Sequence, residues 1–571
     1  MRLIVIALFL TAQTALAQTQ ADPEAATGLA PKPLVIAERH MVVAANPLAS
    51  QAGLDMLRAG GSAADATIAT LLALNVVEPQ SSGVGGGAFA LVHGPDGLTS
   101  FDARETAPAG ATPDMFMAEG DTLPFWDAVR SGRSIGTPGL VRLMEVLHNR
   151  HGKLPWADLF QPAIRLARDG FPVSPRLAGL LETYGGRMAG TDVATVFLPE
   201  GNALPEGSLL KQAALARTLE TIANEGADAF YHGPIADQMA AATARAPLPG
   251  ALSAADLSAY KVIERPAVCH PYLDTRVCGM GPPSSGATTV GQILMLLDRF
   301  KPDELVLDGT QLWHLFAEAS RLAYADRGRY LADSDFVKVP VKGLLDPIYM
   351  DSRAALIHPF SAAKGKAEAG EPPWREGRLY APDLQEDLPG TTHLSVVDAK
   401  GLAISVTASI ETAFGSGRMA GGFILNNQLT DFSFRPEAPN GVAIANAVAP
   451  GKRPRSSMAP TIVFRGEDPV LLTGSPGGSR IPEYVAQSVI GVIGFSLDPA
   501  AAAALPHVSQ RNRGNVALEP GMRDTVVDGL KERGHEVGVR DMTSGLHLIH
   551  IRKDGLRGGA DPRREGVALG D

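Results

Sequence analysis

Apolar residues at helical spacing mark several stretches of the chain. In the run from 310 to 327, the apolar side chains three and four positions apart are Leu312, Leu315, Phe316, Ala319, Leu322 and Ala323. This spacing predicts a helix whose apolar stripe lies in the core. Two more helices are predicted over 51–59 and 62–77, separated by two glycines, with Ser62 as the N-cap of the second.

Runs rich in β-branched residues predict strands, at 89–92, 100–102, 422–425, 461–464 and 470–473. The run 391–397, the turn 398–401 and the run 402–410 form a predicted hairpin. After residue 473, a glycine-rich loop leads into a helix predicted over 479–495. Between 361 and 388 the chain turns to Ala, Gly, Lys, Glu and Pro with little periodicity, which predicts a mobile linker directly before the hairpin.

The N-terminus has the three zones of a secretory signal. Met1 and Arg2 precede an apolar run over 3–10, and small residues follow at Ala15 and Ala17. The apolar run is well short of the ~20 residues that span a bilayer. We therefore predict a signal peptide over 1–17 and export of the mature chain to the periplasm or the medium.

Composition narrows the class of substrate. The 571 residues are 45% hydrophobic and 20% charged, and the formal net charge is −10, which argues against nucleic acid or anionic lipid as a partner. A small molecule is the expected substrate. The two cysteines, Cys269 and Cys278, flank a predicted two-residue hairpin turn and would face each other across it. They are either a disulfide, as an oxidising compartment allows, or two reduced thiols.

Two sequence patterns could suggest a dinucleotide or a metal ion as a ligand, but neither is interpreted as a binding site. Gly83, Gly85 and Ala88 match a dinucleotide fingerprint, but that fingerprint needs a strand before it and a helix after it, and the order here is reversed. We interpret it as a tight turn. The histidines show no metal-ligand spacing, and His547 with His550 is interpreted as a solvated strand face. No metal or cofactor is predicted.

The junction of Gly390 and Thr391 carries the expected chemistry. A threonine hydroxyl needs a base beside it, and its own α-amine can serve once the preceding peptide bond is cut. That amine has a reference pKa of ~7.7 to 8.0, so part of it is neutral near physiological pH. Glycine before the threonine can take backbone angles closed to other residues. A triad with His393 and Asp398 is not favoured, because strand histidines are usually structural and His393 has no identifiable acid partner.

Longer motifs surround this junction. They are 391–398, 414–417, 425–428, 452–458 and 473–480, together with 60–66, 104–108, 282–286 and 559–564. In order and spacing the chain resembles the gamma-glutamyltranspeptidase family over nearly all of its mature length. The resemblance implies an α+β fold, the four-layer αββα fold of N-terminal nucleophile hydrolases. It also implies autocatalytic cleavage between Gly390 and Thr391 into a large subunit, 18–390, and a small catalytic subunit, 391–571, which remain together as a heterodimer of one shared fold.

The family resemblance also implies a γ-glutamyl donor such as glutathione, whose acyl group passes to Thr391 and then to water or an amine. Arg104 would clamp the donor's α-carboxylate, for which a guanidinium is well shaped, and Ser456 and Ser457 would add hydroxyl donors. The α-ammonium acceptors would be Glu411, Gln428 and Asp431.

Two glycines are placed to stabilise the oxyanion. The amides of Gly477 and Gly478, at the start of the predicted helix, make an oxyanion hole that the helix dipole assists. Ser409 stands where many relatives carry a threonine that hydrogen-bonds the nucleophile, so the hydroxyl is kept without the β-branch. We expect a modest loss of rate from this exchange.

The stretch from 431 to 457 looks shorter than the lid loop of relatives that cover the donor, and it lacks their aromatic residue. Hydrolysis is then expected to outrun transfer. Two alternatives remain open at this point. One is an acylase that removes a glutaryl-like group from a β-lactam or related amide with the same threonine, although a glutaryl group has no amine for the three ammonium acceptors. The other is an exported, non-catalytic binding protein.

Overall fold

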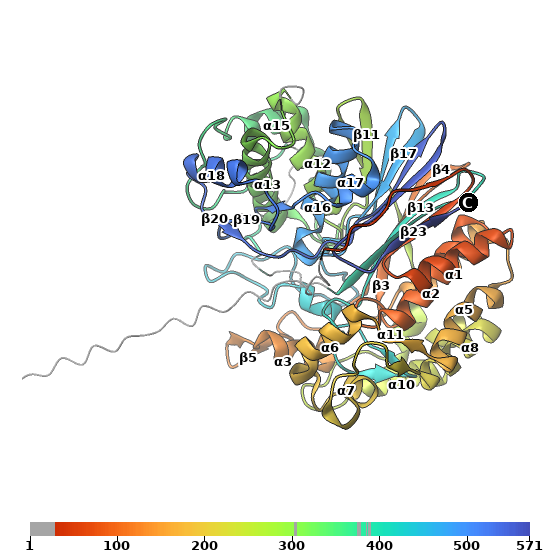
Figure 1. Ribbon diagram of the computed structural model, residues 1–571. Helices are drawn as coiled ribbons and strands as arrows, with labels where there is room; N and C mark the ends of the chain where they lie inside the picture. The colour runs from red at the N-terminus through yellow and green to blue at the C-terminus, as the bar shows by residue number, and fades with distance from the viewer. Residues whose placement is uncertain (1–28, 302–304, 374–378, 384, 386–389) are drawn as a thin grey trace, which may run out of the picture.

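The computed structural model describes residues 29–301, 305–373, 379–383, 385 and 390–571. The proposed signal, 1–17, lies outside these residues and stays a prediction. Two seven-stranded antiparallel sheets lie face to face, and helices cover the outer side of each sheet (Figure 1). This is the four-layer αββα arrangement expected from the sequence.

The first sheet has the strand order β1-β22-β21-β17-β16-β11-β10. Its strands span, in that order, Val35–Ala37, Gly555–Ala560, His547–Arg552, Asp468–Thr473, Thr461–Arg465, Thr275–Gly279 and Val268–Tyr272. The helical layer on this sheet contains α12 (Gly286–Leu297), α13 (Thr310–Tyr330), α16 (Ile481–Val489) and α17 (Pro499–Ala503). Figure 1 shows them on the side of this sheet that faces away from the second sheet.

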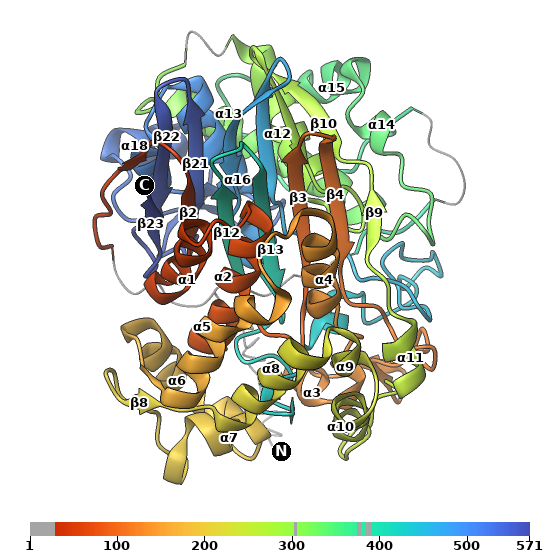
Figure 2. The same ribbon diagram turned by 90° about the vertical axis from the view of Figure 1, so that its right-hand side faces the viewer.

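The second sheet has the order β23-β2-β12-β13-β3-β4-β9. Its strands span Val567–Gly570, Met41–Ala44, Thr391–Val397, Ala403–Ser409, Gly87–Gly94, Gly97–Ala103 and Ile263–Arg265. The helices on its outer side are α1 (Pro47–Arg58), α2 (Ala63–Val77), α4 (Leu140–His151), α5 (Trp156–Asp169) and α8 (Ala213–Glu225), several of which face the viewer in Figure 2.

The described part of the chain contains further α-helices and strands. The helices are α3 (Phe125–Arg130), α6 (Pro175–Met188), α7 (Asp192–Phe197), α9 (Asp228–Tyr231), α10 (Pro234–Thr243), α11 (Ala254–Ala259), α14 (Val341–Leu344), α15 (Pro347–Ala354) and α18 (Asp524–Glu532). The strands are β5 (Met117–Ala118), β6 (Asp121–Thr122), β7 (Phe171–Pro172), β8 (Leu209–Leu210), β14 (Met419–Ala420), β15 (Phe423–Ile424), β18 (Val508–Ser509), β19 (Val516–Leu518) and β20 (Val537–Val539).

Both faces of the central strands are buried, which explains why they read as continuous apolar runs. On β2, Val42 packs toward the outer helices while Val43 packs between the sheets. On β3, Ala90 and Leu91 divide in the same way. Successive side chains of a strand point to opposite faces, so a single run supplies two cores.

Most predicted elements are present with shifted ends. The first helix begins at Pro47 rather than 51, because Asn46 caps it and proline suits its first turn. Ser62 caps α2 as predicted. The helix predicted over 479–495 is divided into a 3₁₀ turn, α16 and a short π-helical turn over 490–494.

Two sequence interpretations concerned side chains of the first sheet. Cys269 and Cys278 are register partners on β10 and β11, and they form a disulfide. The interpretation of His547 as part of a solvated strand face is wrong, because the ring is fully buried and stacks on His393. The His547 side chain lies between the two sheets, against His393 of the second sheet, and hydropathy alone does not show that.

The described part of the predicted linker has no helix or regular strand over 361–373, yet it is anchored. The amide of Ala362 donates to the Arg533 carbonyl at 2.7 Å, and the amide of Gly370 donates to Asp326 Oδ1 at 2.8 Å. Its mobility stays a prediction, and 374–378, 384 and 386–389 lie outside the described residues.

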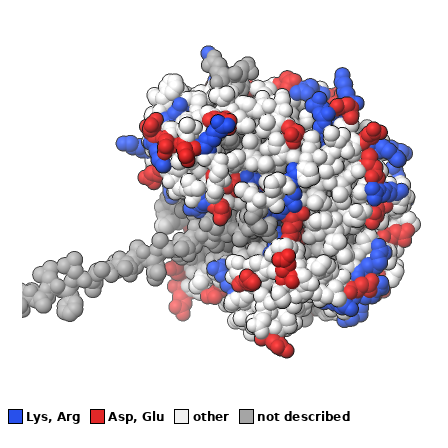
Figure 3. All heavy atoms as spheres, in the orientation of Figure 1, with Lys and Arg blue, Asp and Glu red and all other residues white. Residues whose placement is uncertain are grey.

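Figure 3 shows acidic and basic side chains intermixed over one face of the molecule, without a field of one sign there. Within the ranges that the structure describes, we find no helix with the length and apolar character needed to cross a membrane.

Candidate active site

Four strand ends of the second sheet meet at one end of the sandwich. Thr391 begins β12 and is the register partner of Ser409, which ends β13. Ser409 in turn lies opposite Gly87, which begins β3, and Ala103 ends the neighbouring β4. Arg104 follows directly. The antiparallel order thus gathers residues about 300 positions apart in sequence.

The side chain of Thr391 belongs to the row of β12 that faces the first sheet. Leu394 and Val396 pack toward the outer helices, so the alternate residues point the other way. Accordingly, the Ser395 hydroxyl donates to the His547 carbonyl of β21 at 2.9 Å. Thr391 therefore lies at the end of the space between the sheets, and only 4% of its surface is exposed.

The Ser409 hydroxyl joins the predicted nucleophile to the predicted cleavage point. Thr391 Oγ1 donates to Ser409 Oγ at 3.4 Å, and Ser409 Oγ donates to the Gly390 carbonyl at 3.0 Å. The amide of Glu411 donates to the same Ser409 oxygen at 2.8 Å, which fixes its position. The Ser409 hydroxyl thus contacts both Thr391 Oγ1, the proposed attacking atom, and the Gly390 carbonyl, the group proposed to be attacked.

Gly390 has a steric reason to be glycine, beside the backbone freedom expected from the sequence. A Cβ added there would lie 2.3 Å from the Glu411 carbonyl oxygen and 2.6 Å from that of Thr412. Neither backbone group can move aside as a flexible side chain could. Close approach of two backbones therefore excludes any side chain at 390.

The glycine loop after β17 packs against the strand of Thr391. A Cβ at Gly474 would lie 2.3 Å from the His393 ring, so the loop and β12 are in direct contact. Gly477 and Gly478 have φ of 139° and 58°, in the region that favours glycine, and Gly478 begins the turn before α16. The two predicted oxyanion glycines are thus on a loop held against the nucleophile's strand.

His393 is neutral and structural, as the sequence analysis expected. Its Nδ1 lies 2.9 Å from Thr407 Oγ1, and burial together with the neighbouring His547 holds its pKa well below the usual range. A catalytic imidazole needs a carboxylate or solvent to stabilise its charged form. His393 therefore acts as packing beneath the glycine loop.

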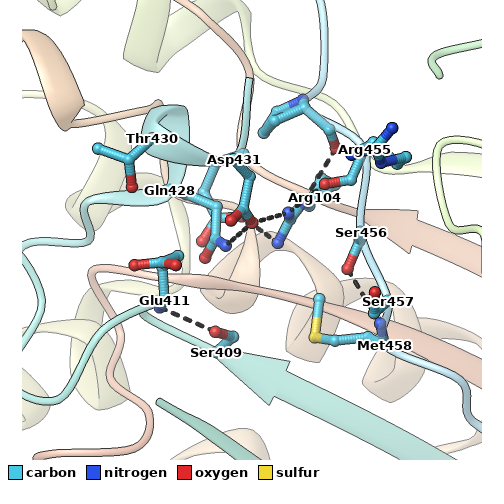
Figure 4. Close-up of polar contacts among 12 residues, drawn as sticks. Arg104, Ser409, Glu411, Gln428, Thr430, Asp431, Arg455, Ser456, Ser457 and Met458 are labelled. Atoms are coloured by element: carbon cyan, nitrogen blue, oxygen red, sulfur yellow. Dashed lines mark hydrogen bonds and ion pairs between the residues drawn. The ribbon is translucent and has the colours of Figure 1, made fainter. Parts of the chain in front are cut away.

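Arg104 and Asp431 form a buried ion pair near this strand end (Figure 4). Arg104 Nη2 donates to Asp431 Oδ2 at 2.5 Å and to the Arg455 carbonyl at 3.0 Å, and Nε donates to the Pro454 carbonyl at 3.2 Å. Gln428 Nε2 donates to the same Asp431 oxygen at 2.7 Å. A cation and an anion are therefore held side by side.

Glu411 is held in a backbone conformation that is uncommon for a residue with a side chain. Its φ is 79°, and Asn427 Nδ2 donates to its Oε2 at 2.5 Å. Such conformations persist where the surroundings fix them, and they gather at functional sites. Figure 4 shows the carboxylate of Glu411 on the same side as Gln428 and above Ser409.

Ser456 and Ser457 directly follow Arg455, whose carbonyl accepts from Arg104, in the loop that precedes β16 (Figure 4). Ser456 Oγ accepts from the Met458 amide at 3.1 Å, and Ser457 Oγ accepts from Arg327 Nη2 of α13 at 2.6 Å. The contact with Arg327 joins this loop to α13, one of the helices on the outer side of the first sheet.

Four further residues of the site were not predicted. Asn427 holds Glu411, Arg327 holds Ser457, and Arg564 Nη1 donates to the Thr391 carbonyl at 3.4 Å. Glu105 lies fully buried beside Arg104. Each of them except Arg327 falls inside a motif singled out from the sequence, but the motif alone gives no partner for the side chain.

Glu105 is a buried acid with an unusual proton affinity. Burial raises its pKa to about 8, although Arg104, 3.8 Å away, opposes the shift. In the described part of the chain, neither oxygen of its carboxyl has a hydrogen-bond partner. Glu105 is therefore mostly protonated at neutral pH.

This raised pKa predicts a pH-dependent loss of stability. The native state keeps a proton that the unfolded state releases above its pKa near 4.5, so stability falls as pH rises from about 4.5 to about 8. Glu105→Gln keeps the neutral form at every pH. The free energy of unfolding is measured for the variant and for the parent at pH 5 and at pH 8.5. We expect the variant's value minus the parent's value to be about 3 kcal/mol larger at pH 8.5 than at pH 5.

The control is Glu264→Gln, whose side chain is half exposed and pairs with Arg150. Its effect should be small and nearly the same at both pH values. An equal effect of Glu105→Gln at pH 5 and pH 8.5 would contradict the raised pKa.

The fold and the site together define a class. A threonine at the start of a buried strand, joined to its preceding glycine and set in an αββα sandwich, is the arrangement of N-terminal nucleophile hydrolases, which cleave amide bonds. Within the described ranges, no cluster of three or more His, Cys, Asp or Glu could hold a metal ion.

Comparison with known proteins specifies the family. Residues 49–571 match the family model of gamma-glutamyltranspeptidase. The glutathione hydrolase proenzymes of Escherichia coli and Bacillus subtilis strain 168 are 39% and 38% identical, over 93% and 94% of this chain and 91% and 92% of their own lengths. A cephalosporin acylase of Bacillus halodurans has a structure of TM-score 0.85 and 29% identity, covering 97% of this chain and 99% of that one.

The chain belongs to the gamma-glutamyltranspeptidase family. It is therefore a gamma-glutamyl transferase or hydrolase that matures by autocatalytic processing into two associated subunits.

Proposed function

We propose that Thr391 is both the residue that cuts the chain and, as the new N-terminus, the nucleophile toward γ-glutamyl amides. The observation that carries the substrate class is the ion pair of Arg104 and Asp431 near the end of the strand that Thr391 begins. An α-amino acid carries its carboxylate and ammonium on one carbon. Their receptors must therefore be neighbours of opposite charge, as these two side chains are.

The first reaction is internal. Thr391 Oγ1 attacks the carbonyl carbon of Gly390, while the Ser409 hydroxyl donates to the carbonyl oxygen. The acyl group of Gly390 moves from nitrogen to oxygen, the hydroxyl proton goes to the nitrogen as the C–N bond breaks, and water then hydrolyses the ester. The products are a carboxylate on Gly390 and an amine on Thr391, at the junction of the large and small subunits.

The second reaction uses that amine as the base. It takes the proton of Thr391 Oγ1 as the oxygen attacks the donor's γ-carbonyl, and the proton then goes to the leaving amine. The amides of Gly477 and Gly478 stabilise the oxyanion. Water hydrolyses the resulting ester, or an amine takes the acyl group.

The donor's amino acid end is proposed to bind with its carboxylate on Arg104, Ser456 and Ser457. Its ammonium would bind to Glu411, Gln428 and Asp431. On binding, Arg104 would pair with the carboxylate of the donor and Asp431 with its ammonium, in place of their contact with each other. A buried charge is stable only when it is paired, so a donor lacking either charge binds poorly.

An acylase activity is the second candidate, favoured by the structural likeness to a cephalosporin acylase. A glutaryl group lacks the ammonium and would leave the three acceptors without a cation. Comparison of γ-glutamyl-p-nitroanilide with glutaryl-p-nitroanilide as substrates distinguishes the γ-glutamyl activity from the acylase activity. We expect kcat/KM to favour the γ-glutamyl donor by about 100-fold or more.

The cleavage itself is tested by electrophoresis and N-terminal sequencing of the purified protein. We expect two fragments, the smaller beginning at Thr391. Gly390→Ala should slow cleavage by about 100-fold or more, because a Cβ at 2.3 Å from the Glu411 carbonyl shifts the scissile bond.

The matched control is Gly179→Ala, in the exposed middle of α6, where a Cβ would meet nothing within 4 Å. This variant should be processed like the parent. A parent chain that is active yet intact across Gly390 and Thr391 would refute the proposal.

Two expectations extend this proposal. The signal over 1–17 would direct the chain out of the cytoplasm, and the enzyme would act in the periplasm or the medium. Water would be the preferred acceptor if the stretch from 431 to 457 is, as the sequence predicts, shorter than the lid loop of relatives. The aromatic side chain of Phe434 stacks on Phe116 in a separate buried cluster, so it supplies no lid over the donor.

A further inference from the structure

The disulfide of Cys269 and Cys278 lies at an outer edge of the first sheet. Cys269 is on β10, the last strand in the order of that sheet, and Cys278 is its register partner on β11. The sequence contains no other cysteine, so any cysteine chemistry of this protein takes place at this pair. The pair has no part in the reactions proposed for Thr391.

The two cysteines differ in their access to solvent. Cys269 is partly exposed, as an edge strand allows, whereas Cys278 is fully buried among the apolar residues between the sheets. A small thiol arriving from solvent can therefore reach Cys269 but not Cys278. Attack on the sulfur of Cys269 makes the sulfur of Cys278 the leaving group.

A guanidinium lies beside this leaving sulfur. Arg276 Nη1 donates to Cys278 Sγ at 3.3 Å and to Cys269 Sγ at 3.7 Å. A thiolate in apolar surroundings is unstable unless a cation is next to it, and the attraction between the two charges is stronger there than in water. Stabilising the leaving thiolate accelerates thiol–disulfide exchange. The position of Arg276 therefore favours exchange in the direction that solvent access selects.

Arg276 is held in this position before any exchange. Its guanidinium carbon lies over the Phe464 ring of β16, 4.7 Å from the ring centroid, and Nη2 is 3.5 Å from Glu467 Oε2. The Glu467 side chain is 96% exposed, so solvent screens this ion pair. The aromatic ring orients the guanidinium without neutralising it. The positive charge thus stays available to the sulfurs.

We propose that the disulfide of Cys269 and Cys278 is a site of exchange with small thiols, which form a mixed disulfide on Cys269. A thiolate attacks Cys269 Sγ, the bond between the two protein sulfurs breaks with its electron pair on Cys278 Sγ, and Arg276 pairs with the new thiolate. Return attack by Cys278 expels the thiol and restores the disulfide, so one round consumes no oxidant.

The expected ligands are aminothiols of the size of cysteine and its dipeptides. The proposed reaction on glutathione releases cysteinylglycine, which carries a free thiol, so the enzyme would meet its own product at the disulfide. The inference goes beyond the proposed function, because the exchange needs neither Thr391 nor a γ-glutamyl group.

The edge hairpin keeps other bonds when the disulfide opens. β10 pairs with β11 over five register positions, and β11 pairs with β16 over four. After β11, the hydroxyls of Ser284 and Ser285 donate to the Met458 and Ser456 carbonyls at 2.6 Å and 2.8 Å. Exchange is therefore expected to take place in the folded protein.

The test exposes the processed enzyme to cysteinylglycine at neutral pH and alkylates free thiols with N-ethylmaleimide at early time points. Peptide mass spectrometry shows which cysteine carries the dipeptide and which the alkyl group, and the trapped fraction gives the rate. Circular dichroism of the same samples reports whether the protein stays folded. Cysteinylglycine is no γ-glutamyl donor, so the result does not depend on turnover, and loss of the proposed function would be a separate outcome.

Two variants separate direct contact from general attraction of an anionic thiolate. Arg276→Gln removes the cation beside the sulfurs and should slow formation of the mixed disulfide by about three- to tenfold, since the rate depends on the stability of the leaving thiolate. The control is Arg465→Gln on the neighbouring strand, which removes one positive charge where Arg465 and its partner Asp274, in the turn of the same hairpin, are both exposed. This control should exchange like the parent.

The expected result is an early adduct on Cys269, with Cys278 alkylated, in protein that keeps its folded spectrum. The inference is overturned if the disulfide opens only in denaturant, if the early adduct is on Cys278, or if Arg276→Gln exchanges as fast as the parent. Should Arg276→Gln fail to fold, the position of the adduct in the folded parent still decides.

Discussion

Replacing Thr391 by alanine should leave the protein as one intact chain without measurable turnover. The substitution removes the only atom proposed to attack both the Gly390 carbonyl and the donor, so each reaction loses its nucleophile. We expect activity to fall by at least about 10⁴-fold. Electrophoresis reports the cleavage, and release of p-nitroaniline from the γ-glutamyl anilide reports the turnover.

Two matched variants separate chemistry from folding. Thr391→Ser keeps a hydroxyl and should be processed and active at a reduced rate, because the β-branch that restricts the rotamer is lost. Thr392→Ala changes the neighbouring buried residue on the opposite face of β12 and should be processed like the parent. Cleavage of Thr391→Ala at the same bond would show that another residue attacks Gly390.

Replacing Arg104 by lysine should weaken the donor much more than it slows the chemistry. Lysine keeps the positive charge opposite Asp431, but a single ammonium cannot reach the Pro454 and Arg455 carbonyls and a ligand carboxylate together. We expect KM for γ-glutamyl-p-nitroanilide to rise by about 100-fold with kcat changed by much less. Initial rates over a wide donor range measure both constants.

Lysine is preferred to alanine at this position because Arg104 is 1% exposed and pairs with Asp431. Removal of the charge would leave a buried carboxylate without its cation and would confound binding with stability. Arg150→Lys, on a half-exposed ion pair with Glu264, is the control and should keep the parent's KM. An unchanged KM in Arg104→Lys would remove Arg104 from the donor site.

The local elements were predictable because their signals are local. The hairpin 391–410 follows from β-branched residues on both sides of a turn, and the structure has it with the ends shifted by one residue. The cap of α2 by Ser62 follows from hydrogen bonding within four residues. The start of α1 was placed four residues late, since the sequence interpretation overlooked Asn46 as a cap.

The candidate site was predicted as a set of residues and not as a set of contacts. Motif resemblance proposed Arg104, Asp431 and Gln428 without showing that they form one buried network. It gave no reason to choose Glu105, whose raised pKa depends on burial among segments distant in sequence. Electrostatic shifts of this kind arise from three-dimensional surroundings, which no spacing along the chain encodes.

Through its resemblance to the family, the sequence by itself predicted the αββα class, the junction of Gly390 and Thr391, and the polar residues proposed for the site. These depend on residue type and on order along the chain. Only the tertiary structure decided which groups meet: Ser409 on the Gly390 carbonyl, His393 beneath the glycine loop, and Asp383 on Arg455. The physical reason is that antiparallel pairing brings strand ends together across hundreds of residues, and hydrogen bonds and ion pairs act only over a few ångströms.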